Sequence, residues 1–227
     1  MKTDEYKIET EPIFDQLGLY RATLIQHPLL IAAEQGELPR ETLLEFAFHQ
    51  YSDSILWIPM LAQMKSRVTR SGRLRRAIEE NIAHEAGLGA ESHVTLAVRM
   101  MRSLGVRSAN DFPREMFDRA ATYWLSDEFA AFDEPEIVGW LLTAETLVPL
   151  MFAAVAKSFD AMGCDARYFH EHVAVDGDEH ATWMAEAAND VVSLHGVDCV
   201  PAILAGMEEA WAETREVPDL LWHHVAR

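Results

Sequence analysis

Two histidines and an aspartate recur every four residues in the segment Tyr168–Trp183. His172, Asp176 and His180 are spaced i, i+4 and i+8. In a continuous helix each step of four residues turns by about 40°, so these side chains would share one stripe. Imidazoles and a carboxylate on one stripe are suitable ligands for a transition metal. The alternative is an Asp–His ion pair on an exposed helix, and this segment alone does not decide between the two.

A second candidate is Glu145, a carboxylate in an otherwise apolar stretch. It is the only charged residue between Glu136 and Lys157. Burying an unpaired carboxylate costs several kcal/mol, so a partner is expected. A metal ion would be one such partner, and a buried Arg or His would be another. We favour a functional role for Glu145 over a structural ion pair.

The third candidate segment, residues 79–93, is rich in acids and histidines. Glu85 and His93 lie on either side of Gly87, which weakens the helix between them. A Glu near such an irregularity and a His one or two turns later can converge on one ion. His84 competes with Glu85 as the inward-pointing residue, so this choice stays open.

Together the three segments supply six nitrogen and oxygen donors from separate helices. Such a set suits two five- or six-coordinate ions better than one, and carboxylate–imidazole sites in helical bundles typically hold iron or manganese. Structural zinc would more often use cysteine, and Cys164 and Cys199 lie outside these segments. The predicted metal ligands are Glu85, His93, Glu145, His172, Asp176 and His180.

The elements that carry these residues are predicted to be helices. Apolar residues repeat at helical spacing, and no segment alternates as a strand does. Pro59 is expected to kink its helix rather than end it. We expect helices over residues 12–27, 29–35, 39–64, 71–87, 91–104, 113–131, 135–159, 165–194 and 201–213, then a short turn or helix from Pro218.

Composition and length point to one all-α domain. The chain has 227 residues, 49% of them hydrophobic, which is enough for a single packed core. No linker or repeat divides it. We therefore predict a bundle of about seven long helices over residues 1–227, with residues 1–10 as a flexible tail.

Net charge and hydropathy limit the classes of molecule that this protein is expected to bind. A formal net charge of -18 disfavours nucleic acid and anionic lipid. There is no uninterrupted apolar run of about 20 residues and no apolar leader at the N-terminus, so we expect no membrane span and a cytoplasmic location. The expected partner is a small-molecule substrate.

The ligand pattern resembles that of the haem-oxygenase-like di-iron oxidases and oxygenases, whose helical fold is shared with haem oxygenase and the TenA thiaminases. The resemblance covers most of the chain, residues 27–183. Members of this family take a Glu and a His, then a lone Glu, then a His-x-x-x-Asp-x-x-His run as ligands. In this sequence these positions correspond to Glu85 and His93, to Glu145 in TAETLVP, and to His172 and Asp176 in HVAVD.

Two spacings depart from the family's pattern. The last family histidine comes three residues after the Asp, where this chain has Glu179, and the histidine is His180. One extra residue, eased by Gly177, can be absorbed as a π-type bulge; otherwise Asp178 or Glu179 ligates instead. The stretch 85–93 is also about one residue longer than usual.

The resemblance implies a cofactor of two iron ions and O2 as co-substrate. The implied reaction is the oxidation or cleavage of a small amino-acid-derived substrate, with a homodimer and an external electron donor as expected partners. The alternatives are oxidation of a fatty acid or another small molecule, and a metal-free TenA-like hydrolase. Neither cysteine is well placed as the nucleophile that such a hydrolase needs. Haem binding through His27 is a further alternative, which the many core carboxylates disfavour.

Substrate-binding residues are not identified by the sequence. An amino-acid carboxylate would need a cation, for which Arg21, Lys65 and Arg99 are the candidates, each more typical of the surface. His27 and His49 are better explained as structural histidines. Aromatic and Met residues that could line a pocket, although most are expected to be core, are Phe48, Tyr51, Trp57, Met60, Trp140, Met151 and Trp183.

Overall fold

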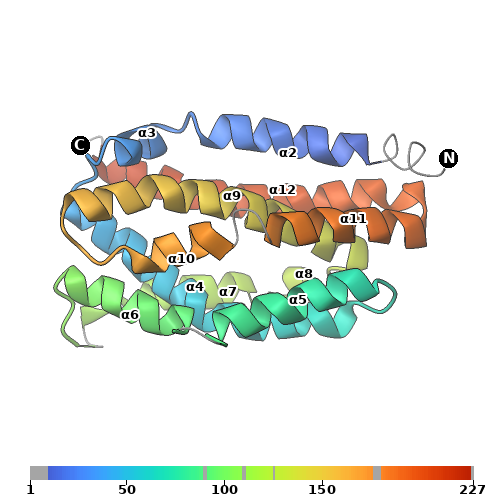
Figure 1. The fold of residues 1–227 in the computed structure, drawn as a ribbon, viewed down its shortest axis with the longest axis horizontal. Helices are drawn as coiled ribbons and strands as arrows, with labels where there is room; N and C mark the ends of the chain where they lie inside the picture. The colour runs from blue at the N-terminus through green and yellow to red at the C-terminus, as the bar shows by residue number, and fades with distance from the viewer. Residues whose placement is uncertain (1–9, 89–90, 109–110, 125, 176–179, 226–227) are drawn as a thin grey trace.

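The computed structural model describes residues 10–88, 91–108, 111–124, 126–175 and 180–225, and these form an all-helical bundle without a β-strand. In Figure 1, α2 lies along one long edge of the bundle, α5 and α6 lie along the opposite edge, and α9 runs between them. The helices are α2 (Glu11–Leu24), α3 (Pro28–Glu34), α4 (Arg40–Arg67), α5 (Gly72–Glu85), α6 (His93–Ser103), α7 (Arg114–Trp124), α8 (Asp127–Ala130), α9 (Glu134–Ala161), α10 (Arg167–Val175), α11 (Ala181–His195) and α12 (Val200–Val225).

Helix α9 is the centre of the bundle. Asp133 and Glu136 start it with a reciprocal capping box, each side chain accepting a hydrogen bond from the backbone N–H of the other. The helix packs against α12, α11, α10 and α3. By length and apolar composition it is the one described helix that could cross a membrane, but most of it is buried inside the bundle. Its apolar character is that of a core helix.

Helices α9 and α12 touch backbone to backbone at two glycines. A Cβ atom at Gly139 would overlap the carbonyl oxygen of Ile203, and one at Gly206 would overlap the carbonyl oxygen of Glu136. Glycine is therefore required at both positions by the close approach of the helices. This crossing fixes the relative positions of residues further along the two helices. They include Glu145 on α9 and Glu213 on α12, which comes seven residues after Gly206.

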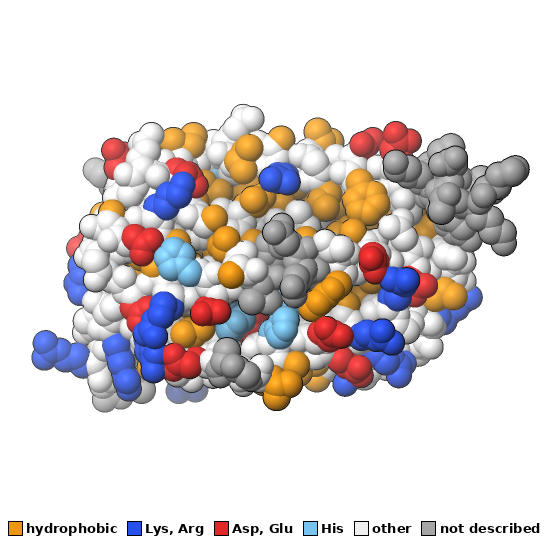
Figure 2. Space-filling model, viewed as in Figure 1, with side chains coloured by type: hydrophobic (Ala, Val, Ile, Leu, Met, Phe, Trp, Pro, Cys, Tyr) orange, Lys and Arg blue, Asp and Glu red, His pale blue; other side chains and the backbone are white. Residues whose placement is uncertain are grey.

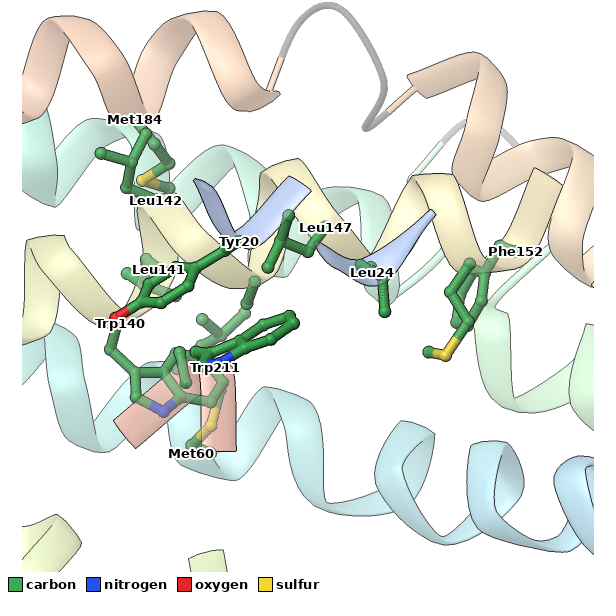
Figure 3. Packing of buried hydrophobic residues seen from close by; sticks show 14 of the residues in the cluster. Tyr20, Leu24, Met60, Trp140, Leu141, Leu142, Leu147, Phe152, Met184 and Trp211 are labelled. Atoms are coloured by element: carbon green, nitrogen blue, oxygen red, sulfur yellow. The ribbon is translucent and has the colours of Figure 1, made fainter. Parts of the chain in front are cut away.

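The apolar core is continuous and rich in aromatic side chains. Figure 3 shows Trp140 and Met60 close to Trp211, and Tyr20 from α2 beside the same indole. The Tyr20 and Trp211 rings stack with centroids 4.9 Å apart. Outside the core, Figure 2 shows histidine, acidic and basic side chains along the middle and lower part of one face. The interior can therefore hold helices rigidly around a polar site.

The all-α prediction agrees with the fold, but two expected elements differ. Of the expected helix 165–194, the structure describes α10, which ends at Val175, and α11, which begins at Ala181, and residues 176–179 between them lie outside the described residues. The expected helix 113–131 breaks into α7 and α8, where Ser126 caps the new start by accepting from Phe129 N at 3.1 Å. The expected end of a helix at residue 213 is also wrong.

Helix α12 continues through Pro218, which had been expected to begin a separate turn or helix. Buried Trp211 and Leu221 pack in the core on either side of this proline. Tertiary packing therefore offsets the hydrogen bond that proline removes. With these changes the described chain has more helical segments than the predicted seven. Residues 1–9 of the expected flexible tail lie outside the described residues.

Candidate metal centre

Glu85, His93 and His172 form one buried cluster, made by α5, α6 and α10. The Glu85 Oε2 atom lies 2.7 Å from His93 Nδ1, and Glu85 Oε1 lies 3.9 Å from His172 Nε2. One donor atom from each residue lies within 4.8 Å of the others. Donor atoms bound about 2.0–2.2 Å from a shared ion are up to about 4.4 Å apart, so a small contraction would complete the site.

A tight turn brings Glu85 and His93 together. Glu85 is the last residue of α5, Gly87 follows it with φ +76°, and His93 is the first residue of α6. A Cβ at Gly87 would lie only 2.4–2.8 Å from the backbone of Glu91 and Ser92, so the turn needs a glycine. The predicted weak joint in this segment is therefore what allows the two side chains to converge.

His172 is held in the form that binds a metal. Its Nδ1 atom lies 2.7 Å from the Tyr168 carbonyl oxygen, to which it donates, and this leaves the Nε2 lone pair facing Glu85. Burial lowers the pKa of His172 well below its usual range, and the nearby His93 lowers it further. A neutral imidazole whose second nitrogen donates to a carbonyl is typical of a metal ligand.

Glu145 and His180 form a second buried pair, made by α9 and the start of α11. The Glu145 Oε2 atom lies 3.2 Å from His180 Nδ1. Asn81 donates to Glu145 Oε1 at 2.5 Å, and Trp57 Nε1 donates to Asn81 Oδ1 at 3.3 Å. The Glu145 carboxylate is thus oriented from the side opposite His180 by an amide that is itself held in place.

His84 belongs to this second pair rather than to the first cluster. Its Nδ1 atom lies 2.8 Å from His180 Nε2, and the two rings stack with centroids 5.0 Å apart. Trp183 covers both rings, with its ring centroid 5.0 Å from that of His180. The neighbouring residues His84 and Glu85 therefore belong to different clusters. The sequence suggested that only one of the two points inward, but each contributes to a cluster of its own.

Both clusters face one cavity. It encloses about 90 Å³ and is lined by Glu85, Glu145 and His172 together with apolar side chains such as Val148 and Phe152. The cavity offers a largely apolar space of the kind that holds a small organic ligand beside reactive groups.

The structure brings five of the six predicted ligands into two groups, and their role as ligands stays a prediction. Glu85, His93 and His172 meet in one cluster, and Glu145 meets His180. The single stripe predicted from the i, i+4, i+8 spacing stays a prediction, because Asp176 and the residues that join it to His180 lie outside the described residues. His180 lies in a π-helical turn, as the proposed bulge requires. Ligand candidates Asp176, Asp178 and Glu179, with Gly177, lie outside the described residues.

The other polar candidates are not at the cavity. Lys65 pairs with Glu79 and Arg99 pairs with Glu91 at the surface, while Arg21 is exposed. Of the aromatic and Met residues that the sequence proposed, Trp57, Trp140 and Met151 line the cavity and Trp183 covers the second pair, whereas Phe48 and Met60 are core and Tyr51 lines a separate surface pocket.

Two carboxylates that sequence reasoning missed also line the cavity. Asp53 on α4 and Glu213 on α12 lie there with the indole of Trp124. Asp53 in the run YSDSILW had the same signal as Glu145, a lone acid inside an apolar helix. Burial raises the pKa of Asp53 to about 7, although the Trp124 N–H at 3.5 Å acts in the opposite direction.

Asp53→Asn is expected to stabilise the protein at pH 8 but not at pH 4. Because burial places the folded-state pKa above the value of about 4 in an unfolded chain, ionisation of Asp53 opposes folding increasingly between about pH 4 and pH 7. Three pKa units correspond to at most about 4 kcal/mol, and the partial solvent exposure of Asp53 reduces this. We expect a gain of about 2 kcal/mol in the free energy of unfolding at pH 8 and almost none at pH 4. Urea unfolding at both pH values measures it, and an equal gain at both would contradict the buried charge.

The types of donor atom in this cluster fit iron or manganese. Three carboxylate and imidazole side chains converge, His172 presents a neutral nitrogen, and no described cysteine lies nearby. Mixed imidazole and carboxylate ligands suit iron, whereas thiolates would favour zinc or copper. The residues present can therefore hold the metal that the sequence led us to expect.

Known proteins share the fold of this chain and define its family. A crystal structure from Shewanella denitrificans, described as a domain of unknown function with a haem-oxygenase-like fold, superposes with a TM-score of 0.73 at 14% identity, covering 95% of this chain and 93% of that one. No functionally curated protein is detectably similar. The model of a family described as iron-containing redox enzymes matches residues 40–213, more than half of the chain. The chain therefore belongs to this family of iron-containing redox enzymes.

Proposed function

We propose that this chain is a non-haem di-iron oxygenase or oxidase that uses O2 to oxidise a small organic substrate. The observation that carries the proposal is the pair of buried carboxylate–imidazole clusters facing one cavity. Two clusters of this kind suit two ions, and an apolar cavity beside them suits a substrate.

Each side chain has a defined role in this proposal. Glu85, His93 and His172 would hold one iron, and Glu145 and His180 would hold the other. Asp176, carried over from the family resemblance, and His84 are the candidates to complete the second set. Bound iron would supply the reduction of O2, and an external electron donor would provide electrons that the substrate does not.

The remaining chemistry is done by the protein around the ligands. The Tyr168 carbonyl fixes the tautomer and direction of His172, and Asn81 fixes the direction of Glu145. Apolar side chains of the cavity, including Val148 and Phe152, exclude water from the reacting atoms.

The alternative functions have less support. Neither Cys164 nor Cys199 lines the cavity, so a metal-free hydrolase has no nucleophilic thiol there. Both ring nitrogens of His27 are engaged, Nδ1 by Leu29 N and Nε2 by Asp219, which disfavours haem binding through this residue. No Lys or Arg is among the described cavity residues, so a fatty acid or an amino-acid carboxylate would have no cationic side chain to bind there, only the proposed iron ions.

Anaerobic titration of the apoprotein with Fe(II) should reach about two ions per chain, because two donor sets are present. O2 consumption should then depend on the bound iron. Bound iron is measured by chelation assay after desalting, and manganese and zinc serve as competing ions. Uptake of no iron, or tight binding of haem instead, would overturn the proposal.

A further inference from the structure

Two carboxylates that line the cavity belong to neither metal cluster. Asp53 on α4 and Glu213 on α12 lie 160 positions apart in the sequence yet line the same space as Glu85, Glu145 and His172. Neither residue is near the predicted ligands along the chain. Burying two further carboxylates in one cavity is costly for folding, so a compensating role is expected.

The interactions of this acid pair are with neutral groups. Asp53 accepts a hydrogen bond from Trp124 Nε1 at 3.5 Å, and Glu213 is hydrogen-bonded by the Tyr123 hydroxyl. No Lys or Arg is found among the described residues that line the cavity. Neutral hydrogen-bond donors therefore contact both carboxylates, and the described cavity wall provides no positively charged side chain to balance them.

Three indoles line the same cavity. Trp57, Trp124 and Trp140 all line it, with ring centroids 5.3–5.7 Å apart. The N–H groups of Trp124 and Trp140 point into the acid network, towards Asp53 and the Tyr123 hydroxyl (3.4 Å). Aromatic faces beside carboxylates are the usual chemistry for binding an organic cation.

We propose that Asp53, Glu213 and the three tryptophans bind the protonated amino group of the substrate, so that the enzyme acts on an amine. This inference rests on the proposed function, because it names the class of substrate that the proposed oxygenase would bind in this cavity. The ammonium would lie beside Asp53 and Glu213, and the rest of the molecule would contact apolar lining residues such as Val148 and Phe152.

Protonation of the empty site is consistent with this role. Burial raises the pKa of Glu213 well above its usual range, and the nearby Asp53 raises it further; Asp53 itself titrates at about 7. At neutral pH the empty pair therefore carries less than its full charge. A bound ammonium would favour the ionised forms, so binding should release protons to the buffer.

Calorimetry of the full-length apoprotein with three ligands of equal chain length tests the proposal. The probes are hexylammonium, hexan-1-ol and hexanoate, which place a cation, a neutral hydroxyl or an anion on the same apolar tail. We expect hexylammonium to bind at least tenfold more tightly than hexan-1-ol, and hexanoate not to bind. Equal binding of the amine and the alcohol, or preferred binding of hexanoate, would overturn it.

Two variants and a control assign the effect to these side chains. Asp53→Asn and Glu213→Gln keep the side-chain shape and should each lower hexylammonium affinity at least tenfold while leaving hexan-1-ol unchanged. Glu80→Gln removes one charge from an exposed position on α5, away from both acids in the sequence, and should change neither. Unchanged amine binding in both cavity variants would overturn the assignment.

Iron binding separates this inference from the proposed function. Both cavity variants should still take up as much Fe(II) as the wild type, since neither residue belongs to a metal cluster. If the wild type binds hexylammonium selectively and no iron, the proposed function fails while the amine site stands. If it binds iron without preference for the amine, the amine site fails alone.

Discussion

Glu85→Gln is expected to remove one of the two iron ions and to abolish O2-dependent turnover. The two oxygens of the Glu85 carboxylate face two imidazoles, Oε2 at 2.7 Å from His93 Nδ1 and Oε1 at 3.9 Å from His172 Nε2. An amide has the same shape but lacks the negative charge that stabilises the cation. We expect iron affinity at this cluster to fall by at least about 100-fold, because loss even of groups that only support a ligand costs about 10–100-fold. Anaerobic titration with Fe(II), read as ions per chain, measures the change.

The matched variant Glu145→Gln separates the two clusters. It should also leave about one iron per chain, because the iron held by Glu145 and His180 would be lost. The double variant should bind none. Glu80→Gln changes the same charge at an exposed position on α5 and should keep the wild-type stoichiometry. Retention of both ions in each single variant would show that these carboxylates are not ligands.

Gly139→Ala is expected to destabilise the fold more than any surface substitution. The new Cβ would overlap the Ile203 carbonyl oxygen on α12, and backbone cannot move aside as a flexible side chain can. The two helices would have to separate along their shared contact. We expect a loss of about 3–5 kcal/mol in the free energy of unfolding, at the upper end of overpacking effects. Urea unfolding followed by circular dichroism measures the loss.

The chain provides a control for this prediction in another helical glycine. At Gly18 in α2 nothing lies within 4 Å of the added Cβ. Gly18→Ala should therefore stabilise the protein by about 0.5–1 kcal/mol, the ordinary helix preference of alanine. A similar small gain at Gly139 would mean that α9 and α12 do not touch there. Gly206→Ala, at the reciprocal contact, should behave as Gly139→Ala does.

Local signals predicted much of what is seen along the chain. Ser71 caps α5, and Gly36 and Gly105 have the positive φ that follows a helix end. Such boundaries are set by hydrogen bonds within a few residues, so the sequence alone predicts them. Where packing competes with local preference, as at Pro218, prediction from the sequence failed.

The candidate ligands were also found from the sequence, because a charged residue within an apolar helix has no inexpensive explanation other than a partner. Asp53 is likewise a lone acid within an apolar helix, but it belongs to no spacing motif and was not among the predicted site residues. Glu213 offered a weaker signal, because other acids surround it in α12. A polar residue in an apolar context is therefore a sounder guide here than a motif.

The sequence by itself determined the helical class, most helix ends and the supply of carboxylates and imidazoles. Only the tertiary structure decided that Glu85, His93 and His172 meet, that Glu145 pairs with His180, and that Asp53 and Glu213 share their cavity. Helical periodicity fixes which residues share a face of one helix, but not which faces of different helices meet. That choice depends on contacts between distant segments, such as the glycine crossing of α9 and α12, whose energies no local pattern contains.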